Sequence, residues 1–333
     1  MKAKTKSFRK LAKRSIRLWS GFFVVVASVL LYSLIAPQLR QSLGLIGNSE
    51  VPQKTQSLRL VTWNLHNFPN AQQNLERIQS TILGLNADLI AVQEVVNKDA
   101  LAQLFPTWQL YLSQAGGRGH QKLGVLVNPE TIEVIGLPQE HPELSFSGDL
   151  RPAYSLYVRA RHLPLDFHVV VVHLKARSVG FEIRQTQWNA LNHILAQLPQ
   201  QSPGQGDQDI ILLGDFNMTG PENESADVEL EELQAILGAQ NLVPIENPAG
   251  CSVYWDGQRR DAWKEPSLLD MIWVTGLPRE SLSTAQALTH CDHYRCQPFR
   301  STKAYPELDY EAMSDHCPVM LDIYTNSSAL VQK

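Results

Sequence analysis

The chain has 333 residues, of which 44% are apolar, so it can bury one large core and is not a disordered polypeptide. Its formal net charge of −4 is unevenly distributed: removing the eight bases of the first 18 residues from the total of 29 leaves 21 bases against 33 acids. Residues 19–333 therefore carry 12 net negative charges and lack the broad basic surface typical of proteins that bind a nucleic acid duplex.

The N-terminus combines a basic block, residues 1–18, with an uncharged run from Trp19 to Ala36. As a helix this run spans about 27 Å, close to the thickness of a bilayer's hydrocarbon core. We expect residues 19–36 to form a transmembrane signal anchor, with residues 1–18 in the cytoplasm and the rest of the chain outside it, because basic flanks stay inside. A cleaved signal peptide, which would make the protein secreted, and a buried core helix are the alternatives. Residues 37–57, rich in Gln, Ser and Pro, predict a linker.

The remainder, residues 58–326, is expected to be one domain of many strands and few helices, followed by a tail at 327–333. Apolar, β-prone runs predict strands at 58–63, 89–92, 123–127, 153–160, 167–174, 210–213, 268–274 and 318–324. Apolar residues at helical spacing predict helices around residues 75–85, after Phe181 through Leu198, and around 230–237. This composition predicts an α/β or α+β fold, and periodicity alone does not choose between the two.

Four cysteines, Cys251, Cys291, Cys296 and Cys317, would lie in an oxidising compartment if the chain is exported. They allow three complete pairings. Cys291 and Cys296 are close enough in sequence to close a small loop, so we expect a disulfide between them, with four free thiols as the alternative. A zinc site is less favoured, because these two cysteines with His290 and His293 lack a second ligand pair at zinc-finger spacing.

Polar side chains recur at or near the ends of the predicted strands, and they are of types that cleave phosphoesters. Residues gathered at one rim of a sheet can form a site although they are distant in sequence. Carboxylates, amides and imidazoles supply metal ligands and proton acceptors. The candidates are Asn64, Glu94, His173, Asp215, Asn217, Asp270, Asp315 and His316.

Each of these residues also has a purely structural interpretation. Asp215 and Asn217 can cap a turn after a strand, and His173 can be a hydrogen-bonded core histidine. Asn64 and Glu94 can be ordinary polar groups at strand ends. Asp270 is harder to explain in this way, because it lies in an apolar strand and a buried carboxylate needs a partner. Taken jointly, the residues favour a functional site.

Seven short motifs in this order resemble the endonuclease/exonuclease/phosphatase superfamily, over about residues 58–324. Its members include DNase I, abasic-site endonucleases, neutral sphingomyelinases and inositol polyphosphate 5-phosphatases. The motifs are Thr62-Trp63-Asn64, Gln93-Glu94, Arg151-Pro152, His173-Leu174-Lys175, Gly214-Asp215-Phe216-Asn217, Leu269-Asp270 and Ser314-Asp315-His316. The resemblance implies a four-layer α/β sandwich, in which two mixed β-sheets pack together between outer helices, and metal-assisted phosphoester hydrolysis.

The resemblance also implies roles for the matching residues. Glu94 is expected to be the main ligand of Mg²⁺, or alternatively Mn²⁺ or Ca²⁺, with Asn64 and Asp315 close by. Asp270 and His316 are expected to pair so that the imidazole takes a proton from the attacking water. The attacking water and a phosphate oxygen would be held by Asp215 and Asn217. His173 would stabilise developing charge or assist the leaving group, and Arg151 would contact the phosphate.

Two departures from the family pattern bear on the substrate. Abasic-site endonucleases place Asp two residues after the first-motif Asn, where this chain has His66, and they carry Asn in place of His173. Both differences argue against a cytosolic enzyme of base-excision repair. The pattern at His173 is nearer the DNase I and sphingomyelinase branches, and the sequence does not choose between those two. The longer substrate motifs of the inositol phosphatases are not found in this sequence.

We therefore expect a membrane-anchored or secreted metal-dependent phosphodiesterase, acting as a DNase I-like endonuclease on DNA or RNA outside the cytoplasm. A sphingomyelinase-like phospholipid phosphodiesterase and a catalytically idle, membrane-tethered binding module are the alternatives. No protein partner is predicted. The loop from Gly116 to Lys122 would guide a phosphate backbone or form a solvated hairpin turn. Trp255 and Trp263 would stack on bases or touch a membrane, whereas Trp273 is expected in the core.

Overall fold

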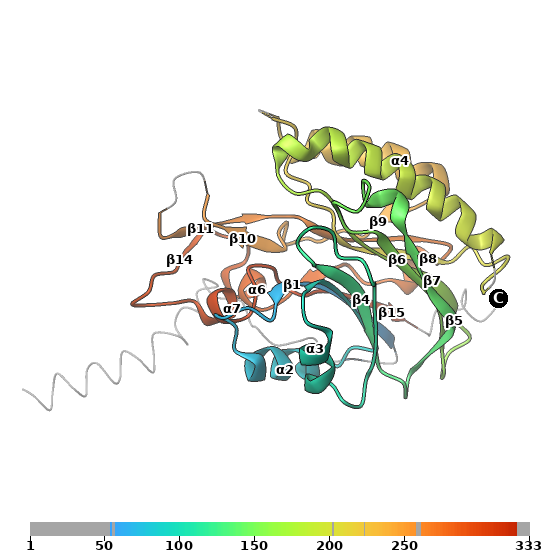
Figure 1. Cartoon of the computed structure of the whole chain (residues 1–333), viewed down its shortest axis with the longest axis horizontal. Helices are drawn as coiled ribbons and strands as arrows, with labels where there is room; N and C mark the ends of the chain where they lie inside the picture. The colour runs from blue at the N-terminus through green and yellow to red at the C-terminus, as the bar shows by residue number, and fades with distance from the viewer. Residues whose placement is uncertain (1–53, 55–56, 202, 223, 258–260, 325–333) are drawn as a thin grey trace, which may run out of the picture. The chain divides into compact units, whose positions relative to one another are not determined.

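The computed structural model describes residue 54 and residues 57–324, except residues 202, 223 and 258–260 (Figure 1). The predicted segments 1–18, 19–36 and 327–333, and all but two residues of the predicted linker 37–57, lie outside this described part. No helix within the described part is both long and apolar enough to cross a bilayer. The N-terminal anchor and its alternatives stay predictions.

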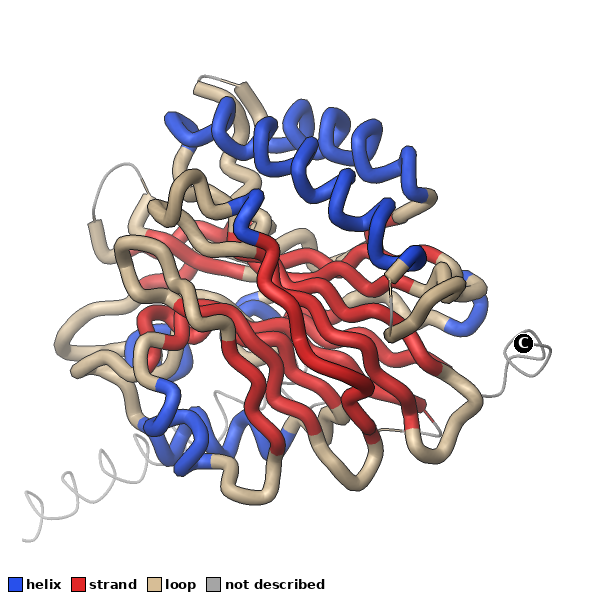
Figure 2. The backbone as a smooth tube through the Cα atoms, turned by 45° about the vertical axis from the view of Figure 1, so that its right-hand side comes forward, coloured by secondary structure: helices blue, strands red, loops and turns tan. Residues whose placement is uncertain are grey.

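Two six-stranded sheets pack face to face (Figure 2). In spatial order the first consists of β13 (Gln286–Ala287), β15 (Val319–Tyr324), β1 (Ser57–Phe68), β2 (Leu89–Val95), β4 (Lys122–Val127) and β3 (Gln109–Leu112). The second consists of β5 (Ile132–His141), β6 (Ala153–Ala160), β7 (Asp166–His173), β8 (Ile210–Asp215), β12 (Asp270–Thr275) and β9 (Val243–Pro244). In each sheet one central pair is parallel, β1 with β2 and β7 with β8, so both sheets are mixed.

Helices cover the two outer faces of this sandwich (Figures 1 and 2). The first sheet packs against α2 (Leu75–Gly84) and α3 (Lys98–Leu104), and the second against α4 (Phe181–Gln197) and α5 (Ala226–Leu237). Short 3-10 helices lie at Pro142–Leu144, Ser178–Gly180, Leu198–Gln200, Gly238–Gln240 and Arg279–Ser281. The layers are helix, sheet, sheet and helix, as the family resemblance implies.

Strand periodicity explains why the interior has separate apolar layers. Along β7, Val169 and Val171 point into the cluster between the two sheets, whereas Val170 and Val172 pack under α4 and α5. Successive side chains of a strand point to opposite faces, so a strand covered on both sides is apolar throughout. The run of four valines is therefore the sequence of a doubly buried central strand.

A smaller third sheet lies beside the sandwich and was not predicted from the sequence. It contains β10 (Val253–Trp255), β11 (Trp263–Ser267) and β14 (Phe299–Arg300), with α6 (His290–Tyr294) and α7 (Leu308–Ala312) nearby (Figure 1). Trp255 and Trp263 are 44% and 49% exposed on this sheet, whereas Trp273 is fully buried in the sandwich. The expected core position of Trp273 is confirmed.

The predicted disulfide between Cys291 and Cys296 is wrong. Cys251 bonds to Cys296, and Cys291 bonds to Cys317. Short sequence spacing favoured the 291–296 pair, but Cys291 belongs to α6 and Cys296 follows the helix, so the two sulfurs face different segments. The same pairing excludes the alternative of four free thiols.

Candidate active site

The candidate residues of both sheets meet at one rim of the sandwich because of strand direction and register. Asn64 lies near the carboxyl end of β1, Glu94 near that of β2, and His173 and Asp215 end β7 and β8. In the second sheet His173 pairs with Asp215, which also pairs with Asp270 at the start of antiparallel β12. A parallel pair ends at one edge, and an antiparallel neighbour begins there, so residues far apart in sequence become neighbours.

Asp270 and His316 form a buried acid–base pair. Nδ1 of His316 lies 2.8 Å from Oδ2 of Asp270, and both residues are less than 10% exposed. Burial opposes the charged form of His316, but the carboxylates of Asp270, Asp215 and Asp315 outweigh it and raise the pKa of His316 well above its usual value. With Nδ1 bonded to Asp270, Nε2 is the nitrogen left to exchange a proton, and it lies 3.8 Å from Oδ2 of Asp215.

Asp215 is the centre of the polar cluster. Its Oδ2 accepts a hydrogen bond from Nδ2 of Asn64 at 3.0 Å and lies 3.3 Å from Nε2 of His173. Burial raises the pKa of Asp215 to about 7, against the opposing charge of His316. Burial, together with the nearby charges of Arg151 and His316, lowers the pKa of His173 well below its usual value, so this imidazole is neutral at pH 7.

Asn217 and Arg151 lie on the same side of the site, where both contact Leu174. Nδ2 of Asn217 and Nη2 of Arg151 donate to the Leu174 carbonyl at 3.2 and 2.8 Å. The Asn217 backbone N–H also donates to Oδ1 of Asp215 at 2.9 Å, in a turn with φ of 52° at Asn217. Two polar atoms of this region, Nε of Arg151 and Nδ1 of His173, are buried without a hydrogen-bond partner. Unpaired buried groups of this kind are available to a phosphate or an ordered water.

Glu94 and Asp315 are the carboxylates of the site that solvent reaches, with side chains 14% and 29% exposed. Oε1 of Glu94 lies 3.4 Å from Nδ2 of Asn64, and Oε2 accepts from the Asn67 backbone N–H at 2.8 Å. Nδ1 of His66 lies 2.9 Å from Oδ1 of Asp315. Burial favours the neutral form of Asp315, but the bond to His66 and the charge of His316 lower its pKa below the usual value. Two solvent-accessible carboxylates beside an amide fit a hard divalent cation that keeps some of its water.

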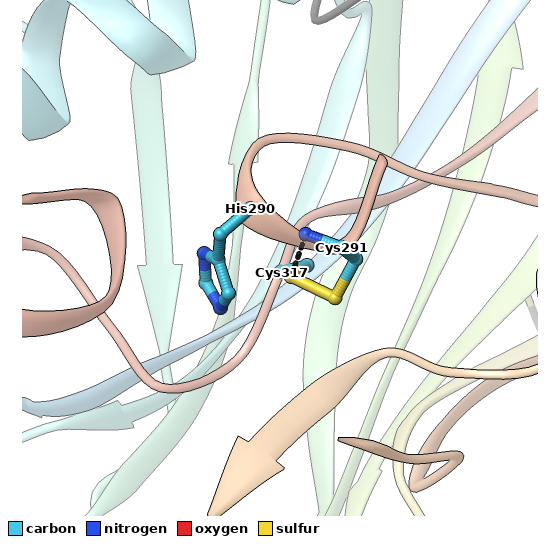
Figure 3. Close-up of side chains that lie close together, drawn as sticks. All are labelled: His290, Cys291 and Cys317. Carbon is cyan, nitrogen blue, oxygen red and sulfur yellow. Dashed lines mark hydrogen bonds between the residues drawn. A yellow bond between two sulfur atoms is a disulfide. The ribbon is translucent and has the colours of Figure 1, made fainter. Parts of the chain in front are cut away.

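Two other groups bring potential metal-binding atoms together in the described part of the chain. Asp215, Asp270 and His316 have ligand atoms within 4.8 Å of one another, but Oδ2 of Asp270 already accepts from His316 and from Ser252. The cluster of His290, Cys291 and Cys317 contains a disulfide, and oxidised sulfurs are not thiolate ligands (Figure 3). Glu94 with Asn64 and Asp315 therefore remains the donor set with the best fit to a cation.

All nine predicted site residues lie at this rim, and the structure adds neighbours that were not among the predicted site residues. Ser252 bonds to Asp270, and Oγ of Ser314 donates to the Asn64 carbonyl at 2.7 Å. Gln121, from the predicted loop 116–122, donates to Asn67 at 2.8 Å and accepts from Arg151 at 3.4 Å. His66 was noted only as a departure from the family pattern. Its position two residues after Asn64 could have indicated that it lies at the site.

Comparison with known proteins agrees with this geometry. The model of the endonuclease/exonuclease/phosphatase family matches residues 61–316. A human protein, "endonuclease/exonuclease/phosphatase family domain-containing protein 1", is 24% identical over 304 residues, covering 80% of this chain and 49% of the relative. The chain thus spans about half the length of that relative.

Solved structures share the fold at low sequence identity. The catalytic domain of human Nocturnin has a TM-score of 0.53 and 16% identity, covering 81% of this chain and 94% of that one. D. rerio TDP2, complexed with a single-strand DNA product, has a TM-score of 0.57 and 13% identity, covering 81% and 100%. A Bacteroides vulgatus endonuclease/exonuclease/phosphatase has a TM-score of 0.54 and 15% identity, covering 82% and 100%. On the match over residues 61–316, this chain belongs to the endonuclease/exonuclease/phosphatase family.

Proposed function

We propose that this protein is a Mg²⁺-dependent phosphodiesterase, and specifically a DNase I-like endonuclease acting on DNA or RNA outside the cytoplasm. Members of its family are mostly hydrolases of phosphoester bonds and typically use a divalent metal ion. The observation that carries the proposal is the meeting of an acid–base pair, Asp270 with His316, and an accessible carboxylate, Glu94, at one rim. Attack of water on a phosphodiester requires a proton acceptor and a stabiliser of phosphate charge, which the acid–base pair and a metal ion at Glu94 would supply.

The residues divide the chemistry among them. His316 takes the proton of the attacking water at Nε2, and Asp270 keeps Nδ1 in the bonded tautomer and balances the charge that results. The carboxylates that raise the pKa of His316 also stabilise the imidazolium that forms when it takes this proton. Neutral His173, with Asn217 and Arg151, supplies donors to the phosphate oxygens and the leaving group. A Mg²⁺ ion held by Glu94, Asn64 and Asp315 would supply further stabilisation of phosphate charge.

Nucleic acid is the substrate class that the surroundings support best. Exposed Trp255 and Trp263 provide aromatic faces, on which bases of a single strand stack with little sequence preference. TDP2, which shares the fold, has been seen with a single-strand DNA product. Two disulfides in the domain support action in an oxidising compartment outside the cytoplasm.

Substitution of the site residues tests the hydrolase assignment. Glu94→Ala, which removes a metal ligand, and His316→Ala, which removes the proton acceptor, are each expected to lower hydrolysis of bis-nitrophenyl phosphate with Mg²⁺ at least a hundredfold. For His316 this is the lower end of the ~10²- to 10⁴-fold range of general acid–base catalysis. Matched controls are Glu130→Ala and His193→Ala, which remove exposed side chains of the same types elsewhere on the domain. Variants of Glu94 and His316 that hydrolyse the diester as fast as these controls would show that the assignment is wrong.

A parallel incubation separates the substrate classes. Residues 50–333 are incubated with plasmid DNA, RNA and sphingomyelin, each with Mg²⁺. Nicking of the plasmid or cleavage of RNA is the expected result. Release of choline phosphate without any cleavage of nucleic acid would replace the nuclease by a phospholipid phosphodiesterase.

A further inference from the structure

Two disulfides connect the segments that carry Ser252 and His316 to one short stretch of chain, α6 and the residues directly after it. Cys291, inside α6, bonds to Cys317, the residue directly after His316 (Figure 3). Cys296, two residues after α6, bonds to Cys251, the residue directly before Ser252. The backbone segment of His316 is thus cross-linked to α6, and that of Ser252 to the residues directly after α6.

Ser252 bonds to the same carboxylate oxygen of Asp270 as His316 does. Its Oγ donates to Oδ2 of Asp270 at 2.8 Å, and this same oxygen is bonded to Nδ1 of His316 at 2.8 Å. The hydroxyl oxygen of Ser252 also accepts from the backbone N–H groups of Asp270 and Leu269, at 2.8 and 3.0 Å. Ser252 is fully buried, so water does not reach these groups to replace the hydroxyl.

The two cross-linked segments are also joined directly through their backbones. The Cys317 N–H donates to the Ser252 carbonyl at 2.8 Å, and the Tyr254 N–H donates to the Asp315 carbonyl at 3.0 Å. On the helix side, Nε2 of His290 lies 3.2 Å from the same Asp315 carbonyl. Burial lowers the pKa of His290 to about 4, so at pH 7 its ring is neutral and does not add charge beside the site.

We propose that Ser252 is a positioning residue for the Asp270–His316 pair, and that the Cys251–Cys296 and Cys291–Cys317 disulfides hold Ser252 in register with it. This inference rests on the proposed function, in which His316 is the proton acceptor. An acid–base group works only when its nitrogen is aimed at the reacting water, and a misplacement of about 1 Å can cost on the order of 10²-fold in rate. Ser252 fixes the carboxylate that aims the imidazole, and the disulfides prevent the two segments from separating.

The first test compares two buried serines in the full-length protein. Ser252→Ala is expected to lower kcat for bis-nitrophenyl phosphate about 10- to 100-fold with KM unchanged, because substrate contacts are retained while the base is less well aimed. Ser281→Ala is the matched control, since Ser281 is equally buried and donates only to the Pro278 carbonyl, away from the site. A kcat for Ser252→Ala within twofold of the Ser281→Ala value would overturn the proposal.

A spectroscopic readout does not depend on turnover. The Nδ1 proton of His316, shared with Asp270, is expected to give a downfield proton resonance that is lost in His316→Ala. In Ser252→Ala this resonance is expected to shift or broaden, and in Ser281→Ala to stay in place. If the resonance stays in place in Ser252→Ala, the positioning role is rejected, whether or not the parent protein hydrolyses a diester. If the resonance moves in Ser252→Ala but the parent protein is inactive, only the proposed function is rejected.

A double-mutant cycle tests whether the disulfides act on the Asp270–His316 pair through Ser252. The paired variant Cys291→Ala/Cys317→Ala is expected to lower kcat at least fivefold in protein that circular dichroism shows to be folded. Adding Ser252→Ala is expected to lower kcat by much less than the product of the two separate effects, because both act on the same pair. Fully multiplicative effects would show that the disulfide does not act through Ser252.

Discussion

A buried ion pair between α4 and α5 holds the two loops that follow the catalytic strands of the second sheet. Arg184 bonds to both carboxylate oxygens of Glu229, and both side chains are 0% exposed. Nη1 of Arg184 donates to the carbonyls of Lys175 and Arg177 at 2.9 and 2.7 Å, just after His173. Glu229 in turn accepts from the Gly220 N–H at 2.7 Å, just after Asn217. The pair therefore supports the site without being part of it.

We predict that Arg184→Ala is strongly destabilising. It leaves the Glu229 carboxylate buried without its counter-charge, which typically costs about 3–5 kcal/mol. At about 2–4 °C per kcal/mol for a domain of this size, Tm falls by on the order of 10 °C. The double variant Arg184→Met/Glu229→Leu removes both charges at similar volume and should recover much of this loss. It should not recover all of it, because the carbonyls of Lys175 and Arg177 lose their donor, at about 1–3 kcal/mol per unsatisfied group.

Urea unfolding followed by circular dichroism, with Tm from calorimetry, measures the three proteins. The expected order of unfolding free energies is parent, then double variant, then Arg184→Ala. Arg159→Ala is the control, because Arg159 and Asp166 form a pair at 3.3 Å with side chains 52% and 40% exposed, typically worth at most about 1 kcal/mol. The reasoning is refuted if Arg184→Ala is as stable as this control, or if the double variant is no more stable than Arg184→Ala.

Three further outcomes are expected. Burial raises the pKa of Asp215 from 3.8 to about 7, so the native state holds a proton that the unfolded chain has released, and stability from this group is lost as pH rises through 7. Tm of the metal-free protein should therefore decrease less between pH 5 and 8 in Asp215→Asn than in the parent. An equal decrease in calorimetry would show that Asp215 does not cause the pH dependence. EDTA should abolish hydrolysis and Mg²⁺ restore it, while Glu94→Gln should weaken Mg²⁺ binding in titration calorimetry at least tenfold; equal affinity would exclude Glu94 as the main ligand. Dithiothreitol reduces each protein disulfide to two thiols and itself becomes a cyclic disulfide. For separations of 45 and 26 residues, the free energy of unfolding should fall by about 3–4 kcal/mol per bond. The measurement is the urea midpoint. A midpoint equal to that of the oxidised protein would argue against these pairings.

The sequence predicted secondary structure best where an apolar pattern corresponds to a segment that is buried in the fold. All eight predicted strands and three predicted helices are present, because apolar runs such as Ile210–Leu213 are long and pure enough to mark doubly covered strands. Seven strands were missed. Of these, β9, β13 and β14 have two residues each, too few for periodicity to be seen, but β3, β10, β11 and the ten-residue β5 were missed as well. The strand ending at Asn64 was predicted too short, since β1 continues to Phe68 through an irregularity in its pairing with β2.

The residue types of the candidate site were also readable from the sequence, because a family motif specifies identity and order. Their partners were not. The spacing of Cys291 and Cys296 suggested a bond that the fold does not make, and nothing in the sequence marks Ser252 as the residue beside Asp270. Likewise, Arg184 and Glu229 are 45 residues apart on two helices, and each alone resembles an ordinary solvated charge.

Local patterns and family motifs therefore predicted the main strands and helices, the family with its layered sandwich, and which carboxylates, amides and imidazoles lie near strand ends. Their contacts became known from the fold alone: His316 bonds to Asp270, Asp215 lies between Asn64 and His173, and the two disulfides end in α6 and directly after it. The physical reason is that periodicity and propensity act over a few residues, whereas these contacts depend on strand register and on the packing of two sheets.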